Sequence, residues 1–160
     1  MIVPTSLLFE ICQQQNLDVE YNYLGTNLRG LYIRHPRLYR PLIELHDSLI
    51  TDERLLRCVL AEEIGHHFTG AGNYMIGYHD STRIWLDKCE CLAMKWAVNY
   101  LVPKDKFILK VGRYPLWELA DIFFVTHDFI MWQYNRLRDA LIEKWKRDPR
   151  EEWELCFESR

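Results

Sequence analysis

The chain has 160 residues, enough for one domain with a hydrophobic core, or for one domain with a small appendage. Apolar residues make up 49% of it, and six Trp, nine Tyr and seven Phe favour a packed globule over a disordered chain. A net charge of −3 argues against nucleic acid or an anionic membrane as the main partner. No window approaches about 18 uninterrupted apolar residues, so we expect no membrane span.

The cysteines and the first residues of the chain indicate its compartment. Five cysteines are present, an odd number at irregular spacing: Cys12, Cys58, Cys89, Cys91 and Cys156. This pattern fits reduced thiols better than a disulfide framework. The first residues also lack the basic segment and long apolar core of a signal peptide. We therefore expect a cytoplasmic protein.

The N-terminal part of the chain predicts one helix followed by three strands. Thr5 can cap a helix whose apolar stripe runs to about residue 16. Alternating apolar and polar residues predict strands at 19–24 and 28–34, and residues 41–45 predict a third. We expect these three strands to form a small antiparallel sheet.

The middle of the chain predicts two long helices. The first runs from Thr51, its expected N-cap, to the glycines at 70–72, which end it. Residues 71–82 predict a loop, and the second long helix runs from 83 to 101. A short helix at 105–111 follows. Sheet and helices together indicate an α+β fold.

The C-terminal part, residues 113–160, predicts a helical extension packed on the same core as the main domain, residues 1–112. Helices at 116–123 and 126–145 resemble a helix-turn-helix, whereas residues 148–160 give no clear pattern. In DNA readers the second helix begins with side chains that reach base edges. Here it begins Thr-His-Asp-Phe, which is acidic and apolar. We therefore expect this helical pair to support the main domain or to dock a protein, and not to bind DNA.

Residues 60–67 read Leu-Ala-Glu-Glu-Ile-Gly-His-His, and they carry the clearest functional signal. Side chains four positions apart lie on one helix face, about 6 Å apart along the axis. Glu62 and His66 therefore point the same way. A zincin helix has two metal ligands at this spacing and a general-base glutamate just after the first. A zincin would carry histidine where this chain has Glu62.

The second long helix offers a third ligand. Glu90 is a charged residue in a largely apolar helix, and carboxylates are rarely buried without a partner. With Glu62 and His66 it would give a metal three protein ligands and an open position for water, and Glu63 is the candidate base. Two alternatives stay open from spacing alone. Glu63 and His67 are also four apart, and the whole string can be an acidic patch followed by cationic residues at a helix end.

Packing explains the other candidate ligands better. Cys58 lies one turn before Glu62 and is expected to be a small core residue. Cys89 and Cys91 are too close together for a Cys-x-x-Cys knuckle, so we interpret both as structural. His46 lies near the end of the third strand, where we expect it in the core or at the surface and not in a cleft.

Four segments together carry a family resemblance: Arg29-Gly30-Leu31-Tyr32, residues 60–68, Glu90-x-x-Ala93-x-x-Trp96-Ala97-x-x-x-Leu101-Val102-Pro103, and Glu118-Leu119-Ala120-Asp121-x-Phe123-x-Val125-Thr126. In this order and at these distances they resemble the ImmA/IrrE family of metallopeptidases. The resemblance spans about residues 5–140.

The resemblance implies a zincin-like fold, with a small sheet packed on two active-site helices. It also implies a zinc-dependent endopeptidase that cuts DNA-binding repressor proteins, of a kind often encoded by phages and other mobile elements. By position, His66 matches the second helix ligand, Glu63 the general base, and Glu90 the ligand from the following helix. The flanking residues put Glu62 where the first histidine belongs, which selects one of the two registers.

Glu62 is the departure from the family pattern. Two glutamates and one histidine cancel the charge of a divalent ion, whereas two histidines and one glutamate leave one positive charge. A more neutral centre is a weaker Lewis acid. We expect metal to bind still, with slower peptide hydrolysis or a preference for a harder ion such as Mn²⁺ over Zn²⁺.

The sequence thus predicts a metal-dependent endopeptidase whose partner is a repressor-like protein substrate. One rival is a non-catalytic protein of the same fold that inactivates a repressor by binding it. A second rival is a helix-turn-helix regulator, which should form a salt-dependent complex with DNA.

Overall fold

The computed structural model describes residues 2–35, 37–70 and 80–147, with the backbone alone at 80–86 and 143–147. Most of the predicted loop at 71–82, and the C-terminal tail with Cys156, lie outside the described residues.

The chain divides into two compact units, Val3–Ala97 and Val98–Arg160 with Met1–Ile2. This division lies closer to the N-terminus than the predicted one after residue 112. The two units are described separately below.

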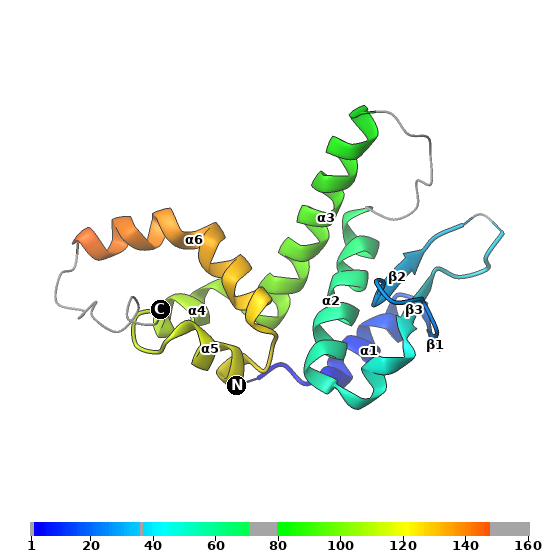
Figure 1. Ribbon diagram of the computed structural model, residues 1–160, viewed down its shortest axis with the longest axis horizontal. Coiled ribbons are helices and arrows are strands. Elements are labelled where there is room, and N and C mark those ends of the chain that lie inside the picture. The colour runs from blue at the N-terminus through cyan, green and yellow to red at the C-terminus, as the bar shows by residue number, and fades with distance from the viewer. Residues whose placement is uncertain (1, 36, 71–79, 148–160) are drawn as a thin grey trace. The chain divides into compact units, whose positions relative to one another are not determined.

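The elements of the first unit follow one another in the predicted order (Figure 1). They are α1 (Thr5–Gln14), β1 (Asp18–Asn22), β2 (Gly30–Ile33), β3 (Leu42–His46), the 3-10 helix η1 (Asp47–Thr51), α2 (Glu53–Thr69) and α3 (Asp80–Leu101), whose last residues belong to the second unit. The predicted α+β class is confirmed, because a small three-stranded sheet accompanies these helices.

The sheet has the order β1-β3-β2, and the prediction that it is antiparallel throughout is wrong. β2 pairs with β3 antiparallel, but β1 pairs with β3 parallel. Side chains alternate with a period of two in both arrangements, so the sequence pattern does not fix strand direction. Burial explains the order: Ile43 and Leu45 of β3 are fully buried, whereas four of the five residues of β1 are exposed. The most buried strand takes the central place, where neighbours satisfy its backbone on both sides.

Both ends of α2 have local causes. The helix begins after Asp52, whose carboxylate accepts a hydrogen bond from the backbone N–H of Leu55 at 3.0 Å. The predicted cap, Thr51, is wrong, because Thr51 ends η1 and the stronger cap follows it. At the other end Gly70 has φ +69°, a left-handed conformation that glycine adopts without strain. The predicted end of the helix is confirmed.

The core of the first unit holds α2 against α1 and the sheet. Its fully buried side chains come from four elements: Leu8 from α1, Ile43 and Leu45 from β3, Leu49 from η1, and Leu60 and Ile64 from α2. Burial of this kind contributes about 1.5–3 kcal/mol per side chain. The polar residues in the C-terminal half of α2 are therefore carried by a helix in a fixed position.

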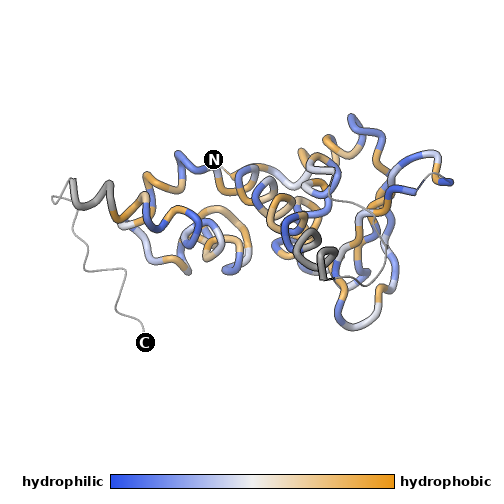
Figure 2. Tube along the Cα trace, turned by 90° about the horizontal axis from the view of Figure 1, so that it is seen from above, coloured by the Kyte–Doolittle hydropathy of each residue, from blue (hydrophilic) through white to orange (hydrophobic). Residues whose placement is uncertain are grey.

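The second unit contains α4 (Lys104–Lys110), α5 (Leu116–Phe123) and α6 (His127–Arg147), which confirm the helices predicted there. Gln133 of α6 is fully buried, and its side-chain amide donates to the carbonyl oxygen of Val102 at 2.9 Å. Figure 2 shows hydrophobic and hydrophilic residues interspersed along the helices. Within the described ranges, no helix is long and apolar enough to cross a membrane.

Candidate metal site

Three potential metal ligands meet where α2 lies beside α3. Glu62 and His66 come from one face of α2, and Glu90 comes from α3. One ligand atom from each side chain lies within 4.8 Å of the other two. His66 Nε2 is 3.3 Å from Glu90 Oε2. The structure thus brings together the three residues that the sequence selected as ligands.

A glycine allows the two helices to approach closely enough for this. A Cβ atom on Gly65 would lie 2.4 Å from the backbone oxygen of Ala93, so no larger residue fits without moving a backbone. Gly65 and Ala93 are both fully buried or nearly so, and each is one turn or less from a ligand. The sequence contained a signal for this contact, because a glycine inside a helix costs about 1 kcal/mol relative to alanine and usually has a packing reason.

Glu63 points toward strand β2, about 100° around α2 from Glu62. A Cβ on Gly30 of β2 would lie 2.6 Å from Glu63 Oε1, so the carboxyl group rests against the strand backbone. The backbone N–H of Tyr32 donates a hydrogen bond to it. Sequence reasoning identified Glu63 but missed the role of β2, since backbone donors leave no mark in a sequence.

Burial is the main influence on the Glu63 carboxyl group. Only 8% of the residue is exposed, and the pKa of Glu63 is raised to about 7, mainly by this desolvation. His66 and the N–H of Tyr32 lower the pKa in part, whereas the negative charges of Glu62 and Glu90 add to the rise. A carboxyl group with a pKa near neutrality can both accept and return a proton.

The two glutamates of the ligand group differ in their surroundings. Burial raises the pKa of Glu62 above its ordinary value, and the neighbouring charge of Glu90 adds to this effect. The hydrogen bond with His66 instead lowers the pKa of Glu90, whose side chain is 61% exposed. Two carboxylates beside one imidazole form an environment that a cation would stabilise.

The donor set and its spacing fit a metal ion. With bonds of about 2.0–2.2 Å to nitrogen and oxygen, the ligand atoms of a tetrahedral site stand about 3.4 Å apart. His66 Nε2 and Glu90 Oε2 lie 3.3 Å apart as a hydrogen-bonded pair, and Glu62 offers an oxygen within 4.8 Å of both, so small shifts would bring the three atoms to this spacing. Among the residues that the structure describes, Glu62, His66 and Glu90 form the one such group of histidine, cysteine and acidic side chains. The group can hold a metal ion.

His67, the alternative histidine, faces β2 with Glu63. Its Nδ1 is hydrogen-bonded to the hydroxyl group of Tyr32 at 3.0 Å, and the two rings meet edge to face. Burial and the charge of Arg34 lower the pKa of His67, which therefore favours the neutral ring. Of the two registers left open by spacing, only Glu62 with His66 points toward Glu90.

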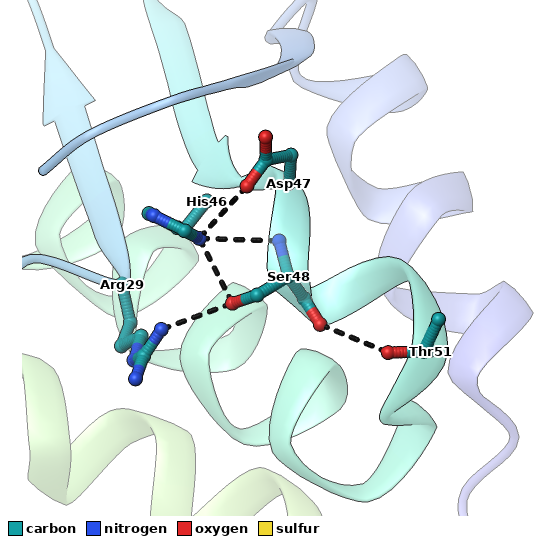
Figure 3. A network of polar contacts seen from close by, with 5 residues as sticks. All are labelled: Arg29, His46, Asp47, Ser48 and Thr51. Atoms are coloured by element: carbon teal, nitrogen blue, oxygen red, sulfur yellow. Dashed lines mark hydrogen bonds and ion pairs between the residues drawn. The ribbon is translucent and has the colours of Figure 1, made fainter. Parts of the chain in front are cut away.

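His46 belongs to a separate network at the end of β3 (Figure 3). Its Nδ1 accepts a hydrogen bond from the backbone N–H of Ser48 at 3.1 Å and lies 2.8 Å from Ser48 Oγ, to which Arg29 donates. Asp47 Oδ1 is 3.1 Å from the same nitrogen. In a catalytic relay the serine and the aspartate contact different nitrogens of the histidine ring. Ser48 and Asp47 both contact Nδ1 of His46, so these contacts cap the 3-10 helix η1 and do not form a relay. His46 is 7% exposed, so of the two expected places, core and surface, it occupies the core.

Cys58, Cys89 and Cys91, the cysteines near the site, form no disulfide in the part of the chain that the structure describes. Cys58 is 2% exposed, which confirms that it is a core residue. Cys89 is also buried, whereas Cys91 is exposed. No cysteine joins the group around His66 within the described part of the chain.

Comparison with known proteins adds no relative to this picture. No protein-family model matches the chain, and no curated protein matches it. A functional proposal therefore rests on the residues, their geometry and the resemblance of the four sequence segments.

Proposed function

We propose that this protein is a metal-dependent endopeptidase with a zincin-like fold, and that its substrate is a DNA-binding protein of the repressor type. The observation that carries the proposal is the placement of Glu63. It is a buried carboxyl group with a pKa of about 7, one residue after Glu62 and beside a three-residue group that can hold a metal. The resemblance of four sequence segments to the ImmA/IrrE family supports the same activity and the substrate class.

Glu62, His66 and Glu90 would hold the metal. When bound, it supplies a Lewis acid that polarises a peptide carbonyl and makes water more acidic. Zn²⁺ accepts this mixture of nitrogen and oxygen donors, and Mn²⁺ is the alternative because two of the three ligands are carboxylates.

Glu63 moves the protons of the reaction. Its carboxylate accepts a proton from the water that attacks the peptide carbonyl, and it delivers that proton to the nitrogen of the leaving amine. One water is consumed, one C–N bond breaks, and a carboxylic acid and an amine result. The N–H of Tyr32 keeps one Glu63 oxygen directed toward β2, so the position of the base is fixed before substrate binds.

The sheet provides a place for the polypeptide. β2 is an edge strand, and its outer side faces Glu63 at Tyr32. An extended peptide can pair with such an edge through backbone hydrogen bonds, which binds many sequences in one orientation. In this proposal the peptide bond to be cleaved lies on this edge, next to Glu63.

Replacement of Glu63 by Gln tests the activity. The amide keeps the shape of the side chain but accepts no proton, so cleavage of a repressor-type protein should fall by about 10²–10⁴-fold. Metal content should not change, since Glu63 is not a ligand. Cleavage is followed by mass spectrometry of the products, with wild-type protein treated with a chelator as a second inactive sample. Undiminished cleavage by the variant would contradict the proposed role.

The same variant distinguishes a second candidate, a protein that inactivates a repressor by binding it. The carboxylate-rich ligand group favours this candidate, because a neutralised metal is a weaker Lewis acid. In that case Glu63→Gln would still relieve repression in cells while no cleavage product is found.

A further inference from the structure

Positive charge is concentrated in one segment of the first unit. Residues 21–43 contain four arginines and no acidic residue, in a chain whose net charge is −3. The remainder of the chain therefore carries −7. Six of the fourteen exposed large hydrophobic side chains of the described residues also lie in this segment: Tyr21, Tyr23, Leu28, Leu31, Leu38 and Tyr39. Basic and apolar side chains gathered in this way indicate a binding surface.

One exposed part of this segment is the loop between β2 and β3, which projects away from α2 (Figure 1). We call five residues of this loop, Arg34, Arg37, Leu38, Tyr39 and Arg40, the basic hairpin. Tyr39 is 97% exposed and Leu38 41% exposed, and all three arginines are exposed. Leu38 and Tyr39 are exposed and not buried in the core, and contact of such apolar surface with water is unfavourable.

The three arginines differ in the partners they have. Arg40 lies 3.5 Å from Asp18 and 5.8 Å from the centre of the Tyr39 ring. Arg34 and Arg37 form no ion pair with a carboxylate in the described part of the chain. Two guanidinium groups are thus available, and each can bind a carboxylate or a phosphate through two parallel hydrogen bonds.

The basic hairpin adjoins the candidate site. Arg34 follows Tyr32 by two positions, which is about 7 Å along an extended strand. Tyr32 is the residue whose backbone N–H donates to Glu63, and the charge of Arg34 reaches both Tyr32 and His67. A polypeptide that follows the outer edge of β2 past Glu63 therefore continues onto the basic hairpin.

The carboxyl group of Glu63 favours a polypeptide over a nucleic acid, because it is hydrogen-bonded to Tyr32, two positions before the hairpin. A nucleic acid carries a phosphate at every residue, so a strand that ran from the hairpin along β2 would also place a phosphate near Glu63. A polypeptide can carry acidic residues only where the arginines lie and a neutral segment at the site. Exposed Leu38 and Tyr39 can in addition pack against its apolar side chains.

We propose that the basic hairpin binds an acidic segment of the polypeptide that the candidate site receives, with Arg34 and Arg37 pairing with its carboxylates. This proposal rests on the proposed function in taking the ligand to be a polypeptide. It names a substrate class: proteins with an acidic segment a few residues from the cleaved bond.

Binding of a defined peptide tests the proposal without requiring cleavage. The protein is the full chain with Glu63→Gln, and the probe is a fluorescein-labelled 15-residue peptide with six Glu and two Leu. A matched peptide has Gln at each Glu position. Fluorescence anisotropy at low salt should give a Kd at least about tenfold lower for the Glu peptide, and the difference should shrink as salt increases.

Charge reversal locates the binding surface. Arg34→Glu with Arg37→Glu should raise the Kd of the Glu peptide at least about tenfold, and Arg34→Gln with Arg37→Gln should raise it less. The matched control is Arg138→Glu with Lys106→Glu, which reverses two exposed cations of the second unit and should change the Kd less than twofold.

Three results would overturn the proposal. The first is equal binding of the Glu and Gln peptides. The second is an effect of the Arg138 and Lys106 control on the Kd as large as that of the double reversal at Arg34 and Arg37. The third is binding of a 12-residue oligo-dT or of phosphatidylserine vesicles that is tighter than binding of the Glu peptide and is lost in the double reversal. Preferential binding of the Glu peptide, together with wild-type protein that cleaves no repressor-type protein when Zn²⁺ or Mn²⁺ is supplied, would reject the proposed function and leave the acidic-segment site standing. Cleavage without a preference for the Glu peptide would do the reverse.

Discussion

The two glutamate–histidine pairs of α2 have the same spacing and different surroundings. Glu62 and His66 face α3, where Glu90 completes a group of three potential ligands. Glu63 and His67 face β2, where Tyr32 contacts both, through its backbone N–H and its hydroxyl group. One pair therefore lies beside a third ligand and the other beside a strand edge. The difference indicates that chemistry on this helix is assigned by its neighbours, because the two pairs are identical in residue type.

The contact of α2 with α3 gives the largest expected effect. In Gly65→Ala the new methyl group would meet the backbone oxygen of Ala93, and a backbone contact cannot be relieved by a rotamer change. Overpacking of this kind costs about 1–3 kcal/mol, and separating the helices would also move Glu90 away from His66. We expect a lower midpoint in denaturant unfolding and loss of metal binding. A variant with unchanged stability and metal affinity would show that the close approach is not needed.

The contact of α2 with β2 should respond differently. In Gly30→Ala the methyl group would meet Oε1 and Cγ of Glu63 and Cγ1 of Val59, which are side-chain atoms and not backbone atoms. We expect the fold and the metal to be retained and the base to be displaced. A misplacement of about 1 Å can reduce catalysis about 10²-fold, measured as kcat with metal content determined on the same sample. Equal loss of metal in Gly30→Ala and in Gly65→Ala would show that the α2–β2 contact and the α2–α3 contact do not have different roles.

The hydroxyl group of Tyr32 should matter least. Tyr32→Phe removes the contact with His67 but keeps the backbone N–H that donates to Glu63. A hydrogen bond of this kind contributes about 1 kcal/mol, so the unfolding free energy should fall by about that amount. Cleavage should change little. A loss of activity as large as that of Gly30→Ala would mean that the hydroxyl group acts in the reaction itself.

Local signals made most of the fold predictable. Proline, glycine and capping residues mark element ends within a few positions, and Gly70 ends α2 as expected. The order and direction of the strands were not predictable, because alternation has the same period in parallel and antiparallel pairs. The position of β1 follows instead from the burial of Ile43 and Leu45 in β3.

The residues of the candidate site could be predicted from the sequence, but the backbone contacts that position them could not. Helical spacing presented both registers equally, and the position of Glu90 decides between them only once α3 lies beside α2. The two glycine contacts, at Gly30 and Gly65, depend on the approach of distant backbones. No local pattern encodes such an approach, although the unexpected glycine inside a helix marks where to look for it.

Metal content tests the central claim most directly. Protein purified without chelators should contain about one metal ion per chain by elemental analysis, as Zn²⁺ or Mn²⁺. Glu62→Ala should lose this metal, because Glu62 belongs to the group of three potential ligands. His67→Ala should keep it, because His67 lies outside that group and faces β2. Absence of stoichiometric metal from the wild-type protein, or equal loss from both variants, would contradict the assignment of the two faces of α2.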